Sequence, residues 1–222
     1  SMNPYSAMTN FFHGQSMVLF DSLGKNTGYY DTNNRLNASK KFDLDMVNIA
    51  KDHNNNTYLS KTNLLFNILG IQDETLKNEY HNDNLIKKTL AKSPLMFLHQ
   101  WSDYSIKGIA MYSILDNIKV LDINNDYIDI NGKPTKDRSK AISLDDAFDN
   151  NDGVLNFKFD NIVKTERTDD LDLFPIANII SRTLRDKFGN YFSPENKSEL
   201  ERTAVGSLIY HMRGGLLPGM KR

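Results

Sequence analysis

The chain has 222 residues and carries 27 Lys and Arg against 28 Asp and Glu, so its overall charge does not indicate a nucleic-acid or membrane-surface protein. It contains no cysteine, which excludes disulfides, thiolate metal sites and cysteine nucleophiles. No apolar run approaches the roughly 18 residues of a membrane-spanning helix, and no membrane span is expected.

A capping side chain followed by proline predicts three helix starts, at Asn3-Pro4, Ser93-Pro94 and Ser193-Pro194. The first helix is expected over residues 4–23, with Gly14 as a weak point. Its apolar stripe is Met8, Phe11, Phe12, Val18, Leu19 and Leu23. Residues 24–41 are rich in Gly and Asn and predict a long loop. Three short helices are predicted after it, at about 43–51, 60–70 and 83–92.

The centre of the chain has the most apolar helical pattern and then changes period. Residues 94–118 are too apolar for an exposed helix, which predicts that they form the centre of the core. Residues 119–130 alternate around Asn124-Asn125, as in a β-hairpin, and 154–159 predict a third strand. Between them, 144–148 predict a single helical turn.

The last third is predicted to be helical again, over 173–188 with a stop at Gly189, and then from Pro194 to a basic tail. The expected fold is therefore mainly α, with a small antiparallel β-hairpin or three-stranded sheet near residues 119–159. We expect a single helical domain over 1–222, with a core at 90–222 and an N-terminal helical portion at 1–89. The alternative is that these residues are a fragment of a larger protein.

Motifs for catalysis or metal binding are missing from the sequence. The five histidines show no i, i+4 pairing, and the chain has no Walker lysine, dinucleotide loop or Gly-x-Ser-x-Gly elbow. Asp122, Asn124 and Asp126 resemble the start of a calcium loop, but Tyr127 replaces the required glycine. The sequence therefore predicts no enzyme activity, no metal and no cofactor.

The basic side chains near the C-terminus are the candidate contact residues. Residues 182–222 hold 8 basic and 4 acidic side chains, whereas 116–172 hold 8 basic and 14 acidic. One interpretation is an anion or nucleic-acid contact through Arg182, Arg185, Arg202, Arg213, Lys221 and Arg222. The favoured interpretation is structural: His211 and Arg213 fasten the end of the last helix, with Arg213 bound to an acidic loop within 145–172.

Several short segments, in order and at matching spacing, resemble a family. They are Tyr104-Ser105-Ile106-Lys107-Gly108-Ile109-Ala110-Met111, Leu144–Phe148, Asn151-Asp152-Gly153 with Phe157 and Phe159, Phe188-Gly189, Ser193-Pro194-Glu195, Arg202 with Ala204, and His211 with Arg213-Gly214. This series, over roughly residues 90–222, is similar to a recurring segment of very large virion proteins of crAss-like bacteriophages. The chain departs from that segment at Gly215, where the family has tryptophan.

The resemblance implies a non-enzymatic module of a phage protein that is stored in the virion and delivered into the host cytoplasm with the genome. Its partners would then be other virion proteins or other segments of a parent chain. The alternative is an accessory module of a virion-packaged RNA polymerase that contacts nucleic acid through the basic residues named above. DNA binding that depends on salt concentration would distinguish the two.

Overall fold

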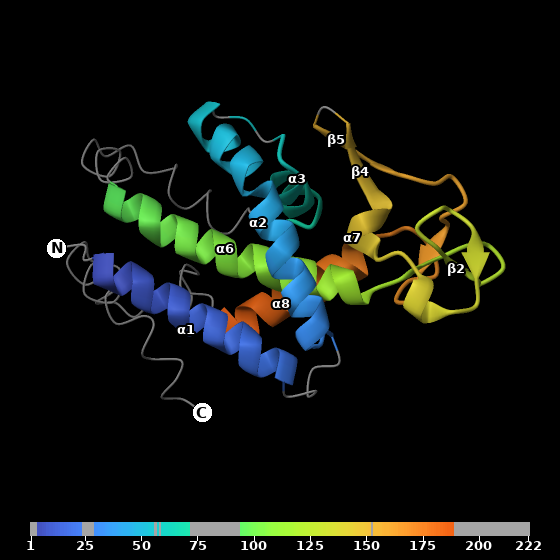
Figure 1. The fold of residues 1–222 in the computed structure, drawn as a ribbon, viewed down its shortest axis with the longest axis horizontal. Helices are drawn as coiled ribbons and strands as arrows, with labels where there is room; N and C mark the ends of the chain where they lie inside the picture. The colour runs from blue at the N-terminus through green and yellow to red at the C-terminus, as the bar shows by residue number, and fades with distance from the viewer. Residues whose placement is uncertain are drawn as a thin grey trace. The chain divides into compact units, whose positions relative to one another are not determined.

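The computed structural model describes residues 4–23, 29–55, 57, 59–71, 94–151 and 153–188. The chain divides into two compact units, each of which is described by itself. Unit 1 holds residues 1–18, 72–107 and 181–222, and unit 2 holds residues 19–71 and 108–180. Figure 1 labels the elements in chain order.

Helices dominate the described part of the chain. They are α1 (Pro4–Leu23), α2 (Thr32–Asn55), α3 (Lys61–Ile68), α6 (Pro94–Asn117), α7 (Leu144–Ala147) and α8 (Phe174–Phe188). Small antiparallel sheets accompany them, so the prediction of a mainly α fold is confirmed. None of these described helices is both long enough and apolar enough to cross a membrane. The helices predicted at 83–92 and from Pro194 onward lie outside the described residues.

The bounds predicted for α1 are confirmed, but four of the six residues of its predicted apolar stripe are exposed. Val18 is fully buried, whereas Met8, Phe12, Leu19 and Leu23 are exposed. The buried face instead includes Gly14. Within unit 1, a Cβ on Gly14 would collide with the side chain of Ile106. Gly14 is therefore the position at which a side chain of α6 meets the backbone of α1.

The predicted loop at 24–41 is wrong from residue 32 onward, because α2 is one helix of 24 residues. The N–H of Asn34 donates to Asp31 Oδ1 at 2.9 Å, and the N–H of Asp31 donates to Asn34 Oδ1 at 3.0 Å. This reciprocal pair caps the first turn, with asparagine in the place of the more usual Glu or Gln. The short helix predicted at 43–51 is the second half of α2.

Two carboxylates on the buried face of α2 hold the start of α3. Asp52 accepts hydrogen bonds from the N–H groups of Leu59 and Ser60, at 2.9 and 2.6 Å. Asp45 Oδ2 accepts from the N–H of Thr62 at 2.8 Å. Burial alone would raise the pKa of Asp52, but these backbone donors lower it well below its usual range. The predicted helix at 60–70 is confirmed as α3, capped by Ser60.

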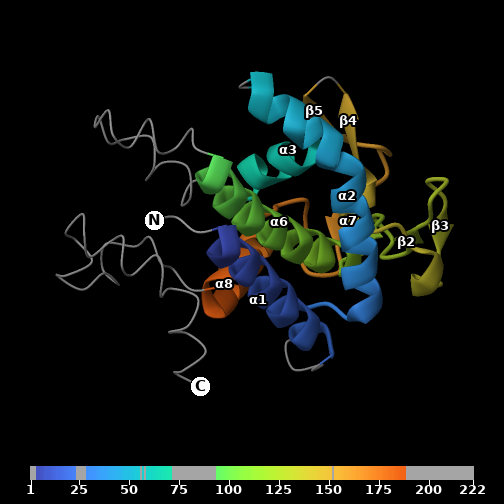
Figure 2. The same cartoon turned by 60° about the vertical axis from the view of Figure 1, so that its left-hand side comes forward.

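The prediction that 94–118 supplies core residues is confirmed for the side chains that are described. In unit 2, Ala110, Met111, Tyr112 and Leu115 are buried. A Cβ on Gly108 would lie 2.5 Å from Phe42 Cε2, so the glycine allows α6 to approach α2 closely. Figures 1 and 2 both show α2 crossing α6 at this end.

The predicted hairpin is confirmed, and it belongs to a larger sheet than expected. Strands β1 (Val120–Leu121) and β2 (Tyr127–Ile128) pair antiparallel around Asn125, which has φ 65. The full order is β3-β2-β1-β6, where β3 is Pro134–Thr135 and β6 is Lys164–Thr165. The residues of β3 and β6 are proline or polar and show no apolar alternation of the kind seen in β1 and β2, which explains why the sequence does not predict them.

The predicted third strand forms, but in a separate sheet. Strand β5 (Val154–Phe157) pairs with β4 (Phe148–Asn151), and Phe148 stacks on Phe157 with ring centroids 4.5 Å apart. The predicted helical turn at 144–148 is confirmed as α7, which leads directly into β4. The helix predicted at 173–188 is confirmed as α8.

Candidate functional site

The structure describes little of the basic set proposed from the sequence. Arg182 lies exposed on α8, and Arg185 is a backbone position in the last turns of the same helix. Four other candidate contact residues lie outside the described residues: Arg202, Arg213, Lys221 and Arg222. His211, the other predicted helix-end fastener, also lies outside them, so both interpretations stay predictions.

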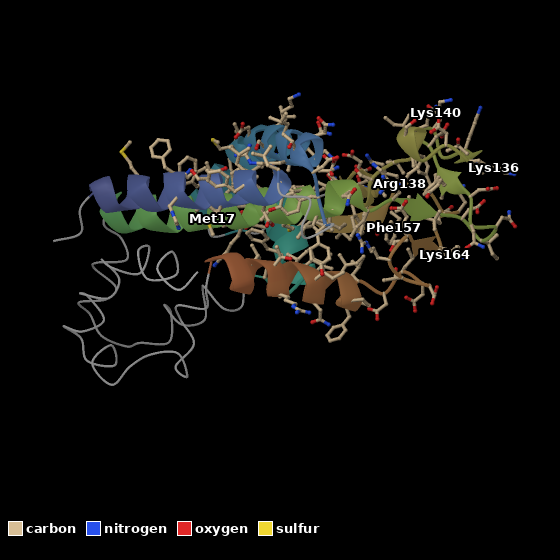
Figure 3. The ribbon with its side chains drawn as sticks, turned by 90° about the horizontal axis from the view of Figure 1, so that it is seen from below. Met17, Lys136, Arg138, Lys140, Phe157 and Lys164 are labelled. Carbon is tan, nitrogen blue, oxygen red and sulfur yellow. The ribbon has the colours of Figure 1, made fainter. Side chains whose placement is uncertain are left out.

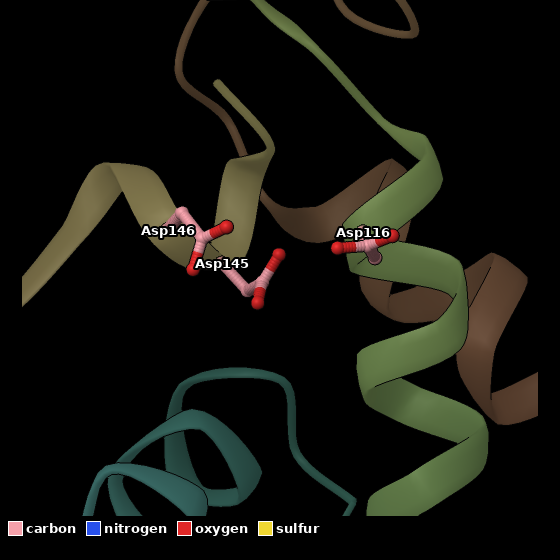
Figure 4. A group of neighbouring side chains, drawn as sticks. All are labelled: Asp116, Asp145 and Asp146. Atoms are coloured by element: carbon pink, nitrogen blue, oxygen red, sulfur yellow. The ribbon is translucent and has the colours of Figure 1, made fainter. Parts of the chain in front are cut away.

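A cluster of charged side chains in unit 2 is a second candidate. The Lys41 cluster consists of Lys41 on α2, Asp116 in the last turn of α6, and Asp145 and Asp146 on α7. Lys41 Nζ lies 2.7 Å from Asp116 Oδ1, 2.6 Å from Asp145 Oδ2 and 2.9 Å from Asp146 Oδ2. Figure 4 shows the three carboxyl groups facing a common space between α6 and α7. One ammonium therefore joins three elements that are far apart in the sequence.

Local hydrogen bonds orient two of these carboxylates. Asp116 Oδ2 accepts from the side-chain amides of Asn34 and Asn37 on the first turns of α2, at 2.8 and 3.4 Å. Ser143, which precedes α7, donates its hydroxyl to Asp146 Oδ2 at 2.9 Å. The asparagines that suggested a loop thus fix the carboxylate of α6 against α2.

Asp145 has the least solvated carboxylate of the cluster. Its side chain is 1% exposed, whereas that of Asp146 is 48% exposed. Its second oxygen, Oδ1, is buried and accepts no hydrogen bond from the part of the chain that the structure describes. Burial raises the pKa of Asp145 even though the nearby Lys41 ammonium opposes that rise. Asp145 therefore depends on Lys41 for its stabilisation as an anion.

Electrostatics hold Lys41 in its charged form. Burial alone would lower the pKa of Lys41, but the charge of Asp145 and the hydrogen bonds to the three carboxylates raise it above its usual range. Lys61 Nζ donates to the carbonyls of Asp145 and Phe148, at 2.6 and 2.9 Å. Lys119 Nζ donates to the carbonyl of Asp116 at 3.2 Å. Two further lysines therefore lie beside the cluster, and burial lowers the pKa of both.

The position of the Lys41 ammonium group decides whether the cluster could hold a metal. One oxygen from each of Asp116, Asp145 and Asp146 lies within 4.8 Å of the others, a spacing that would suit a cation. Lys41 Nζ occupies the position between them, within 2.9 Å of all three. A divalent ion would have to displace Lys41 or place two further positive charges next to its ammonium group. The residues therefore fit a lysine-centred structural cluster better than a metal centre.

Sequence reasoning missed this cluster. The sequence predicts a loop at Lys41 and only a single helical turn at Asp145 and Asp146. One usable signal is present: two adjacent aspartates stand within the mostly apolar run 141–148. Charges at such a place require a buried partner, although the sequence does not say which lysine supplies it.

A second, more exposed ion pair lies near the sheet. Arg138 Nε donates to Glu166 Oε1 at 2.6 Å, and one terminal nitrogen donates to Glu166 Oε2 at 3.0 Å. The same terminal nitrogen also donates to the carbonyl of Asn117 at 2.8 Å. Figure 3 labels Arg138 together with the lysines around it, Lys136, Lys140 and Lys164. This two-point pair links the sheet to the end of α6.

The comparisons with known proteins add no relative. No family model matches the chain, and neither a curated protein nor a solved structure matches it. The function must therefore be argued from the residues themselves.

Proposed function

We propose that this chain is a non-enzymatic module of a large bacteriophage virion protein, carried in the particle and delivered with the genome into the host cytoplasm. It would act through contacts with other virion proteins or with other segments of a parent chain. The observation that carries this proposal is the ordered series of short segments over residues 90–222 that resembles the virion proteins of crAss-like phages.

Two of the resembling segments, residues 104–111 and Leu144–Phe148, are mostly buried, which supports a structural role for them. Leu144, Asp145 and Ala147 are fully buried in α7, and Phe148 is buried against Phe157. Gly108 allows the close contact with Phe42. A series of residues that packs a core is what a structural module needs, whereas an enzyme would place polar groups toward a substrate.

The Lys41 cluster is consistent with the same proposal. Its ammonium makes three short contacts with carboxylates, and Lys61 donates to two backbone carbonyls. A lysine that acts as a nucleophile or base needs a lowered pKa, and the pKa of Lys41 is raised. The three carboxylate contacts and the raised pKa of Lys41 support a structural role for this lysine.

Mass spectrometry of purified phage particles tests the proposal. Peptides of this chain should copurify with particles that contain DNA and should be depleted from particles that have ejected it. A capsid protein of the same phage is the control, because it should remain in both fractions. Production of the chain in infected cells without incorporation into particles would contradict the proposal.

A polymerase accessory module that contacts nucleic acid is the alternative, favoured by the basic stretch 182–222 and the exposed Arg182. Binding to single- and double-stranded DNA would be measured at two salt concentrations. Binding that weakens with salt and is lost in Arg202→Ala with Arg213→Ala would favour this alternative. Absence of binding at low salt would eliminate it.

A further inference from the structure

Helix α2 has an outer face with an unusual pattern. The α2 stripe consists of Leu36, Lys40, Asp43, Leu44 and Val47, all of them exposed. Leu36, Leu44 and Val47 are 49%, 81% and 63% exposed. Spacings of three and four residues place the five side chains on one side of the helix. From Leu36 to Val47 the stripe extends along the helix for about 16 Å.

The opposite face of α2 already serves the core of unit 2. Its buried positions alternate at spacings of four and three residues and are Ala38, Phe42, Asp45, Ile49 and Asp52. A helix that packs on one side normally presents polar residues on the other. Single exposed apolar residues are ordinary, but three of them in one stripe opposite a complete buried face require a more specific explanation.

Four of the five stripe residues form two pairs that are symmetric about one point of the helix. Leu36 and Val47 are centred on the point between residues 41 and 42, and Lys40 and Asp43 are centred on the same point. If two copies of α2 run antiparallel about a two-fold axis there, Leu36 faces the partner's Val47 and Lys40 faces the partner's Asp43. A two-fold interface requires each contact to occur twice, and this pattern meets that requirement.

We infer that the α2 stripe binds a second copy of this chain, as an antiparallel helix pair related by a two-fold axis. The occupant is a second copy because one helix supplies both members of the apolar pair and both members of the charged pair. Neither Lys40 nor Asp43 forms an ion pair with another residue in the described ranges, so both charges are available. The inference rests on α2 alone and does not depend on a phage origin.

The size of the contact predicts a weak association. A stripe of about three helical turns buries less surface than the roughly 800 Å² per partner of a standard interface. The dimer should therefore form at high protein concentration, or when a larger assembly holds the copies close together. The charges set the register, because like charges brought together at these positions would repel.

Sedimentation equilibrium of the full chain across about 10 µM to 1 mM tests the inference, since this range covers weak dissociation constants. The mean mass should rise from the 25.4 kDa of one chain toward twice that value. Lys40→Glu alone and Asp43→Lys alone should each abolish the rise. Lys51→Glu, on the same side of α2 but outside the paired positions, should leave it unchanged.

Mixing the two charge variants gives the decisive measurement. An equimolar mixture of Lys40→Glu and Asp43→Lys should form a mixed dimer, because every contact across the two-fold axis again joins opposite charges. Circular dichroism of each variant establishes that the helices are retained. The inference is overturned if the unchanged chain stays at 25.4 kDa throughout the range. It is equally overturned if the chain associates but the charge variants do not alter the association, or if the mixture stays monomeric.

Discussion

The Lys41 cluster and the Arg138–Glu166 pair use the same attraction between opposite charges in two different environments. Asp145 in the cluster is almost entirely buried, and one of its oxygens has no hydrogen-bond donor among the described residues, whereas the Arg138 side chain is 49% exposed. Water can replace the partner of an exposed charge but cannot reach a buried one. Removing one charge should therefore lower the free energy of unfolding more at the Lys41 cluster than at the Arg138–Glu166 pair, although the contact distances are nearly the same.

The largest effect is expected when the cluster loses its central charge. Lys41→Met keeps the length of the side chain but leaves Asp145 and Asp116 without the ammonium. Stability should fall by about 3–5 kcal/mol, as expected when one partner of a buried ion pair is removed. The neighbouring Lys40→Met is the matched control and should change little. Urea denaturation at low protein concentration measures both, and equal losses would refute the distinction between buried and exposed charges.

Asp52 extends the comparison to a buried carboxylate that is held by backbone N–H donors and not by a lysine. Asp52→Asn replaces a charged acceptor of the Ser60 and Leu59 N–H groups with a neutral one. The expected loss near pH 7 is about 1–3 kcal/mol. Asp43→Asn, on the exposed face of the same helix, is the control.

The pH dependence of this loss follows from the lowered pKa of Asp52. Because the folded pKa lies below the ordinary value of 3.8, the stabilisation is complete above that value and declines as the pH falls toward the folded pKa. The difference in free energy of unfolding between the original chain and Asp52→Asn should therefore become smaller as the pH falls. Denaturation midpoints measured from pH 7 to pH 3 test this, and a constant gap would show that the carboxylate charge contributes nothing.

A smaller effect is expected at the exposed pair. Arg138→Ala removes two contacts to Glu166 and one to the carbonyl of Asn117, and should cost about 1 kcal/mol. The loss should shrink as salt is added, because exposed charges are screened. Lys136→Ala, an exposed neighbour, is the control. A loss as large as that of Lys41→Met would mean that exposure does not decide the outcome.

The smallest effect is expected for Lys140→Ala. Lys140 Nζ lies 3.6 Å from Asp137 Oδ2, within a single turn, and both side chains are largely exposed. Thermal unfolding should not distinguish this variant from the original chain. A measurable shift would indicate that Lys140 contacts another residue in solution.

Helices with strong local signals could be predicted from the sequence, and contacts between distant segments could not. Proline after a capping residue marked the start of α6, and the stripe of α8 was readable from its spacing. Helix α2 was missed in its first part because its asparagines favour loops locally. In the fold, two of them bond Asp116, which is 82 and 79 residues away. No local pattern encodes such a partner.

The candidate site predicted from the sequence differs from the Lys41 cluster for the same reason. Charge content alone indicates the basic residues from Arg182 onward, because they are numerous in a short stretch. The Lys41 cluster contains only four residues drawn from three elements, and only their burial makes them important. For the exposed stripe of α1, periodicity identified apolar residues correctly but could not say which side of the helix faced the core, because apolar residues occur on both sides.

The wide separation of Lys41 from α7 has a consequence for the order in which the chain folds. Lys41 and Asp146 are 105 residues apart, so during synthesis α2 exists long before the carboxylates that surround its lysine. Until then the ammonium must stay hydrated, which opposes early burial of that side of the helix. If the chain is pulled from its C-terminal end, α7 is removed before α2. Once α7 is removed, Lys41 loses two of its three carboxylate partners, so the packing of α2 against α6 should weaken as soon as α7 detaches.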